Sequence, residues 1–306
     1  MIIGYQQILD FFAKATQNNT LSHAYCFSGV SKIGKKTVAK DIASRLLGKD
    51  QEKLATSLDF IYLNRVLDDK TGKLKNEISV DQIRELGARL QMMSWGAGGY
   101  KIVVIDDAEN LSEKASNALL KILEEPNTKT IFFLITIHEG LLLETIKSRC
   151  QIFYFSPLSN KILEAGLIAQ GYNQKQIAEI FPYVNGRAGL AIDLLSSEDL
   201  FNELKTTVKN CDDLINLPVY KRFALLDKYL GGKKETATGK EELTKDIDFW
   251  ILQTRKTMLE NLANESGDNQ LKIKQLGVLL DDMQKARELV SKNINPKLLI
   301  ENLFLN

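Results

Sequence analysis

The 306-residue sequence contains few cysteines, few histidines and almost no excess of either charge. Its three cysteines, Cys26, Cys150 and Cys211, lie far apart and include no C-x-x-C pair, which argues against a structural zinc site and a disulfide framework. The two histidines are too isolated to suggest a metal site. The 40 Lys and Arg residues balance 39 Asp and Glu residues to a formal net charge of +1, so we expect any contact with DNA to be local or shared with partners.

Long apolar segments are also missing from the sequence. No stretch reaches the roughly 18 uncharged apolar residues of a membrane-spanning helix, and the first residues lack the basic region and apolar core of a secretory signal. Together with the sparse cysteines, these features predict a protein of the reducing cytoplasm with no membrane partner.

The first half of the chain alternates between strand-like and helix-like segments. Five short apolar segments have the composition of strands in a buried parallel sheet: residues 23–29, 59–64, 101–107, 130–137 and 151–155. Between them run helical patterns, such as the one that places Val38, Ile42 and Leu46 on a single stripe. This alternation predicts a three-layer α/β domain with ligands at the carboxyl ends of the strands.

The strand-like segments end near residue 157. Residues 158–205 read as short helices interrupted at Gly171 and Gly186, and residues 206–306 read as longer amphipathic helices. The polar stretch at 231–242 has the composition of a loop. The sequence therefore predicts an α/β domain followed by two helical regions.

A glycine-rich stretch, GVSKIGKKT, follows the first predicted strand and opens a helix. Gly29, Gly34 and Lys35 fit the Walker A pattern G-x-x-x-x-G-K-[ST], in which backbone N–H groups and the lysine bind phosphates. The next residue is Lys36, where the pattern needs a hydroxyl for Mg²⁺. Thr37 offers a hydroxyl one residue later, but a helix would rotate it by about 100°.

A second motif, KIVVIDDAENL, resembles a Walker B strand. Asp106 stands where a carboxylate holds Mg²⁺ directly or through water, and predicts a Mg²⁺–ATP site. Asp107 stands where a longer Glu usually activates the attacking water. Acids after a buried strand can also cap the next helix, and for Glu109 we favour this capping role.

Several longer segments resemble the clamp-loader branch of the AAA+ superfamily. They are SNALLKILEEPNTKTIFFLIT, ISVDQIREL, TIKSRCQIFYFSPL with its S-R-C motif, and the terminal NINPKLLIENLFLN. The resemblance covers essentially the whole chain. It implies an AAA+ P-loop domain with a parallel sheet at residues 1–157, a small helical lid at 158–205 and an all-α collar, or oligomerisation domain, at 206–306.

The resemblance also implies a role in DNA replication. Members of the branch help to load the ring-shaped sliding clamp onto primed DNA as hetero-oligomers. The implied partners are the clamp-loader motor subunits and a delta subunit, with the sliding clamp and primer-template DNA contacted through the complex.

Three single residues take implied roles from this family. Arg149 of the S-R-C motif resembles an arginine finger that acts in trans on a neighbouring subunit's γ-phosphate. Its alternative role is a surface charge at a helix C-terminus. Thr136 matches the first sensor and Arg187 the second, while a structural threonine and a surface ion pair are the alternatives.

The chain departs from the family's motor subunits in three ways. Lys36 replaces the magnesium-binding hydroxyl, Asp107 replaces the usual Glu, and the four-cysteine zinc module is absent, so no zinc is expected. We therefore expect the P-loop to be kept for its shape or for weak ATP–Mg²⁺ binding. An active ATP-hydrolysing motor subunit is the main alternative, and an unrelated P-loop kinase or helicase is a third.

The terminal segment predicts an apolar helix that supports assembly. Leu298, Leu299 and Leu303 can share a face of this helix, with Ile300 and Phe304 flanking it. We expect the collar to carry most of the affinity for other subunits.

Overall fold

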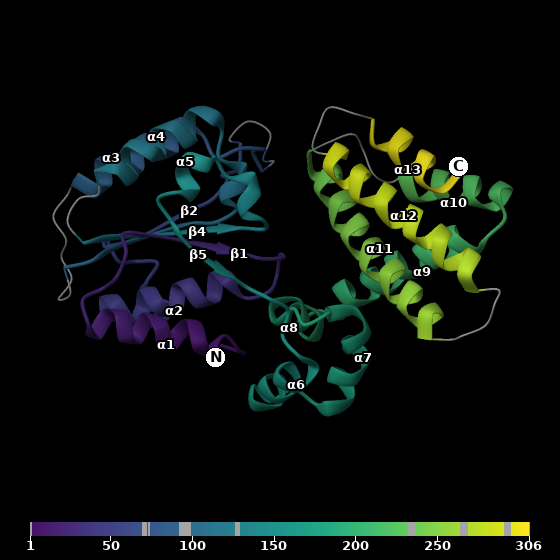
Figure 1. Ribbon diagram of the computed structural model, residues 1–306, viewed down its shortest axis with the longest axis horizontal. Coiled ribbons are helices and arrows are strands. Elements are labelled where there is room, and N and C mark those ends of the chain that lie inside the picture. The colour runs from purple at the N-terminus through teal and green to yellow at the C-terminus, as the bar shows by residue number, and fades with distance from the viewer. Residues whose placement is uncertain are drawn as a thin grey trace. The chain divides into compact units, whose positions relative to one another are not determined.

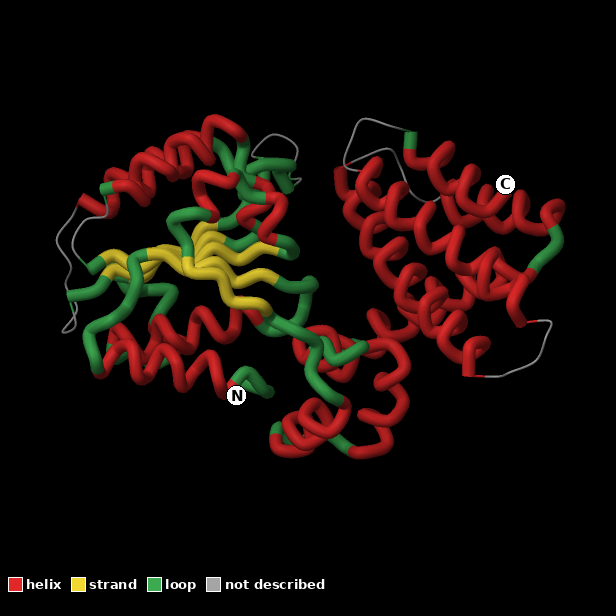
Figure 2. Tube along the Cα trace, viewed as in Figure 1, coloured by secondary structure: helices red, strands yellow, loops and turns green. Residues whose placement is uncertain are grey.

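The computed structural model describes residues 2–68, 72, 74–91, 99–125, 129–231, 237–263, 269–290 and 295–305. The chain divides into two compact units, Met1–Ser197 and Glu198–Asn306 (Figure 1). The first contains the sheet and the second is helical (Figure 2).

A five-stranded parallel sheet forms the centre of the first unit. Its strands are β1 Ala24–Ser28, β2 Phe60–Leu63, β3 Lys101–Ile105, β4 Thr130–Thr136 and β5 Gln151–Tyr154, in the order β2-β3-β4-β1-β5. Every residue of β1, β3 and β4 is buried, as expected for strands covered on both faces. The predicted strands and the α/β fold class are confirmed.

Helices cover both faces of the sheet (Figure 1). One layer holds α1 Gln6–Gln17 and α2 Lys35–Leu47, and the other holds α3 Val80–Gln91 and α4 Glu113–Glu124. Short elements complete the connections: η1 Gln51–Lys53, η2 Ala108–Asn110, η3 Glu139–Leu141 and α5 Glu144–Lys147. The carboxyl ends of the strands are therefore the sheet edge from which the P-loop and the Walker B carboxylates extend.

Aromatic side chains fill the layer between the sheet and α1. The Phe12 ring lies 4.7 Å from the Tyr25 ring and 5.6 Å from the Phe133 ring, and Phe12 is 3% exposed. These rings pack in tilted or edge-to-face pairs, which aromatic rings favour over a direct sandwich. Phe12, Tyr25 and Phe133 are therefore core residues.

Three further helices complete the first unit: α6 Asn160–Ala169, α7 Gln174–Val184 and α8 Ala188–Ser196. Helix α8 contacts the P-loop directly. The Leu190 N–H donates to the Lys32 carbonyl at 3.2 Å, and the Lys32 ammonium lies 2.5 Å from an Asp193 carboxylate oxygen. These helices belong to the same compact unit as the sheet, so the predicted boundary at 157/158 stays a prediction.

The second unit consists of α9 Glu198–Asn216, α10 Val219–Gly231, α11 Ala237–Ala263, α12 Asn269–Val290 and α13 Pro296–Leu305. Trp250 lies fully buried in its core and donates its indole N–H to the Thr207 carbonyl at 3.1 Å. The predicted boundary at 205/206 falls inside α9, whereas the two units divide after Ser197. The three-domain division stays a prediction.

Two local predictions for this unit need correction. Residues 237–242 of the predicted loop are helical, and residues 232–236 lie outside the described part of the chain. In α13, Ile300 and Phe304 are buried against the Trp250 core, while Leu298 is 58% exposed. The apolar face is thus centred on Ile300 and Phe304, four residues apart, with Leu299 and Leu303 partly buried beside them and Leu298 outside it. Among the described helices, none is long and apolar enough to cross a bilayer.

Candidate functional site: a P-loop with an internal cation

The loop between β1 and α2 has the backbone of a phosphate-binding loop. Gly29 has a φ of 155°, and a Cβ there would lie 2.5 Å from the Phe155 carbonyl oxygen. Gly34 has a φ of 117° and forms the N-cap of α2 without a side-chain cap. Both positions need glycine, and the first turn of α2 directs N–H groups toward the loop. The residues present fit a phosphate group.

Lys35 lies inside this loop and is 6% exposed. Its ammonium donates to the carbonyls of Gly29 at 2.5 Å and Val30 at 2.9 Å. Burial lowers the pKa of Lys35 to about 8. The charges of neighbouring carboxylates oppose this shift, and that of Glu109 has the largest effect. The lysine is therefore where the Walker A pattern predicts it.

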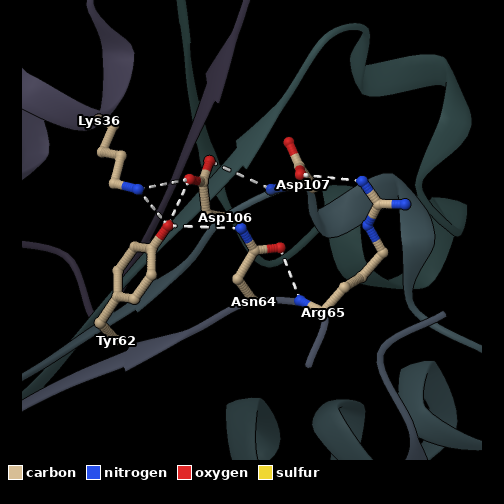
Figure 3. Close-up of polar contacts among 6 residues, drawn as sticks. All are labelled: Lys36, Tyr62, Asn64, Arg65, Asp106 and Asp107. Carbon is tan, nitrogen blue, oxygen red and sulfur yellow. Dashed lines mark hydrogen bonds and ion pairs between the residues drawn. The ribbon is translucent and has the colours of Figure 1, made fainter. Parts of the chain in front are cut away.

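Lys36 occupies the position at which a Mg²⁺ ion would be expected. Its Nζ lies 3.3 Å from Asp106 Oδ2 and 2.5 Å from the Tyr62 hydroxyl, which itself donates to Asp106 Oδ2 at 2.6 Å (Figure 3). A Mg²⁺ ion needs oxygen ligands at about 2.0–2.1 Å in near-octahedral geometry. An ammonium supplies no lone pair and repels a dication. The residues present do not fit a Mg²⁺ site at Asp106.

Thr37 gives no substitute hydroxyl. It lies in the first turn of α2 and is exposed, as expected from the rotation between consecutive helical residues. Within the described residues, no cluster of three or more His, Cys, Asp or Glu side chains is arranged to hold a metal ion.

Asp107 is paired with an arginine. Its Oδ2 lies 3.6 Å from Arg65 Nη2 (Figure 3), and its backbone is left-handed with a φ of 52°. Burial and the charge of Asp106 raise the pKa of Asp107, while Arg65 opposes the shift. The shorter carboxylate at the water-activating position is thus engaged within the chain.

Glu109, for which we favoured a capping role, lies in the first turn of η2. Ser112, not Glu109, caps α4 by accepting from the Ala115 N–H at 3.2 Å. Burial raises the pKa of the Glu109 carboxyl, and a hydrogen bond from its own backbone N–H opposes this shift. Glu109 is also the leading charge acting on Lys35. Its place three residues after Asp106, in a tight 3-10 turn, could have indicated this role.

The two sensor candidates are both buried. Thr136 is 1% exposed, pairs in register with Ser28 of β1 and donates its hydroxyl to the His138 carbonyl at 3.0 Å. Arg187 is 7% exposed and donates to the Val184 carbonyl at 3.2 Å and the Tyr183 carbonyl at 3.5 Å. Arg187 therefore binds the C-terminal carbonyls of α7. Both sensor roles stay predictions.

Arg149 lies between α5 and β5. Its Nη1 donates to the Thr145 carbonyl at 2.9 Å, and its Nη2 lies 2.7 Å from Glu124 Oε1. The side chain is 34% exposed. The Thr145 contact fits a helix-end charge, and the Glu124 contact fixes the guanidinium at the surface of the first unit.

Comparisons with known proteins place this site in a family. The family model described as DNA polymerase III, delta subunit, matches residues 4–159, just over half of the chain. The chain is 25% identical over 264 residues to the DNA polymerase III subunit delta' of Bacillus subtilis (strain 168), covering 85% of this chain and 78% of that protein.

It is also 28% identical over 252 residues to the DNA polymerase III subunit gamma of Buchnera aphidicola subsp. Schizaphis graminum (strain Sg). This match covers 75% of the chain but 66% of the relative, just under two thirds of its length.

A solved structure gives the same fold. The DNA polymerase III gamma subunit-related protein from Thermotoga maritima matches with a TM-score of 0.53 at 18% identity, over 96% of this chain and 97% of that one. At this identity the likeness shows the fold alone. The parallel sheet, the P-loop and the matched family model agree, and the chain belongs to the DNA polymerase III delta-subunit family.

Proposed function

We propose that the chain acts as a delta-prime-like subunit of a DNA polymerase III clamp loader and supplies Arg149 to an adjacent ATPase subunit. In this role it helps to load the sliding clamp onto primed DNA without hydrolysing ATP itself. Its partners would be the motor subunits and a delta subunit, and it would meet the clamp and primer-template DNA within the complex.

The contact between Lys36 and Asp106 carries the first part of this proposal. Hydrolysis needs Mg²⁺ between a Walker A hydroxyl and a Walker B carboxylate. Here an ammonium stands 3.3 Å from that carboxylate, and the neighbouring Asp107 is paired with Arg65. Both groups that a motor subunit uses on metal and water are engaged within the chain.

The exposure of Arg149 supports the second part. An arginine finger must reach a neighbouring subunit, so it needs a surface position and a defined geometry. Arg149 is 34% exposed and is held by Thr145 and Glu124. In the described part of the chain it contacts Thr145, Ser148 and Glu124, none of which belongs to the P-loop.

The test is a reconstituted clamp loader that carries Arg149→Ala or Arg149→Lys in this subunit. We expect both variants to assemble, and we expect ATP hydrolysis to fall at the single adjoining site. Clamp loading should fall further than total hydrolysis, because loading needs all sites together. Lysine should rescue poorly, because it lacks the planar guanidinium.

Arg84→Ala is the matched control, because Arg84 is an exposed arginine paired with Asp81 at 3.0 Å. If Arg149→Ala leaves both hydrolysis and loading at the unmodified level, Arg149 is a helix-end charge.

One observation favours the alternative, an active motor subunit: the P-loop has its glycines and Lys35. We expect the purified chain to hydrolyse ATP no faster than its Lys35→Ala variant. A Mg²⁺-dependent rate that disappears in Lys35→Ala would favour the motor function instead.

A further inference from the structure

Three segments meet at the magnesium position of the P-loop (Figure 3). Lys36 comes from α2, Tyr62 from β2 and Asp106 from the end of β3. The parallel pairing of β2 and β3 aligns Leu63 with Ile105, and the Asp106 N–H donates to the Leu63 carbonyl at 2.9 Å. The strand register therefore places the Tyr62 hydroxyl beside the Asp106 carboxylate.

Lys36 brings one positive charge to the Asp106 carboxylate, where a Mg²⁺ ion would bring two. The Lys36 ammonium neutralises Asp106, and its side chain is 45% exposed while that of Asp106 is 14% exposed. A lysine has three N–H donors. Its recorded contacts with Tyr62 and Asp106 use two of them, which leaves a donor for a phosphate oxygen.

The Lys36–Asp106 ion pair is weak enough for the Lys36 ammonium to contact a phosphate oxygen as well. Solvent screens this ion pair from one side, because the Lys36 side chain is exposed. The Lys36 side chain is flexible and can turn its ammonium toward a polyphosphate while staying near Asp106.

We infer that the Lys36 ammonium replaces Mg²⁺, so that this P-loop binds a nucleoside di- or triphosphate without a divalent cation. Lys35 and the N–H groups of the loop contact the phosphates, and Lys36 supplies one of the two positive charges that the metal supplies elsewhere. An ammonium cannot coordinate phosphate oxygens and water in the fixed octahedral array of Mg²⁺. The nucleotide is therefore bound and not hydrolysed. This inference concerns the chain's own loop and is independent of any action of Arg149 on a neighbour.

The experiment is a titration of the full chain with a fluorescent ADP analogue, in excess Mg²⁺ and again in EDTA. For the unmodified chain we expect the same Kd, within about twofold, in both conditions. For Lys36→Thr, which restores the Walker A hydroxyl, we expect Mg²⁺ to strengthen binding by about tenfold, equivalent to about 1.4 kcal/mol.

Two variants define the site and the specificity of the effect. Lys35→Ala should abolish binding. Lys40→Thr is the matched control, because Lys40 lies one turn further along α2, 5.4 Å from the Tyr62 ring. It should bind the analogue equally well with and without Mg²⁺.

A second readout does not depend on nucleotide fluorescence. The readout is the electron paramagnetic resonance signal of free Mn²⁺ in the presence of ADP. Adding the unmodified chain should not lower this signal below the level measured with ADP alone. With Lys36→Thr, a protein-bound Mn²⁺ signal should appear. The inference is overturned if the unmodified chain binds no analogue, if its binding requires Mg²⁺, or if Lys36→Thr stays independent of Mg²⁺ and binds no Mn²⁺.

Discussion

Glu124 Oε1 lies 2.7 Å from Arg149 Nη2, so a carboxylate at the end of α4 holds the guanidinium that follows α5. The two residues are 25 positions apart in the sequence. The guanidinium is thereby oriented within its own subunit before any neighbour is present. This relationship makes Glu124 a positioning residue for the proposed arginine finger.

The first prediction is that Glu124→Ala weakens hydrolysis at the adjoining site of the reconstituted complex, and by less than Arg149→Ala does. The double variant should be no worse than Arg149→Ala, because Glu124 acts through Arg149. The cost to the free energy of unfolding should stay below about 1 kcal/mol for such an exposed pair. Glu125→Ala is the control, since Glu125 is an exposed glutamate one residue later. Additive losses in the double variant would contradict the positioning role.

The second prediction concerns the pH dependence of stability through Lys35. Burial lowers the pKa of Lys35 from 10.5 to about 8, so between these values the unfolded chain binds more protons than the folded chain. The Lys35 contribution to the free energy of unfolding therefore rises with pH over this range, by at most about 1.4 kcal/mol per pH unit. Urea unfolding of the chain and of Lys35→Met, at several pH values between 8 and 10, measures it. Two curves that run parallel would show that the pKa is not lowered.

The third prediction compares two helical glycines. A Cβ at Gly189 of α8 would lie 2.7 Å from the Lys32 carbonyl oxygen of the P-loop, whereas a Cβ at Gly277 of α12 would have no neighbouring atom within 4 Å. Gly277→Ala should stabilise its unit by up to about 1 kcal/mol through helix propensity. Gly189→Ala should destabilise by about 1–3 kcal/mol through the clash. Hydrogen exchange should also accelerate at the Leu190 N–H, which donates to Lys32. Equal effects of the two substitutions would refute the close contact.

The fourth prediction concerns the core of the second unit. Trp250 is 0% exposed to solvent, and its ring centroid lies 5.3 Å from the ring centroids of Tyr229 and Phe304. Trp250→Ala should cost about 3–5 kcal/mol of unfolding free energy. Trp250→Phe should cost about 1–3 kcal/mol, because the buried Thr207 carbonyl loses its indole donor. Chemical denaturation followed by circular dichroism distinguishes the two. A cost below 1 kcal/mol for alanine would place Trp250 outside the core.

Local patterns in the sequence were sufficient to predict much of the fold. Short runs of β-branched and aromatic residues predicted all five strands. Three of these strands, β1, β3 and β4, are buried at every residue, and a strand covered on both faces must be apolar throughout. Gly29, Gly34 and Lys35 predicted the P-loop, because its backbone angles and its lysine follow from adjacent residues. The sequence alone also showed that Lys36 replaces the hydroxyl on which magnesium binding depends.

The tertiary structure decided which distant side chains meet. Strand pairing and the position of α2 over the sheet bring together Lys36, Tyr62 and Asp106. Lys36 and Tyr62 are 26 positions apart in the sequence, and Tyr62 and Asp106 are 44 positions apart. The same long-range packing placed Glu109 where its charge acts on Lys35, and selected Ile300 over Leu298 for the core. Periodicity indicates which residues share a face of one element, but it does not encode the neighbour that covers that face. That choice comes from burial and pairing between segments far apart in the chain.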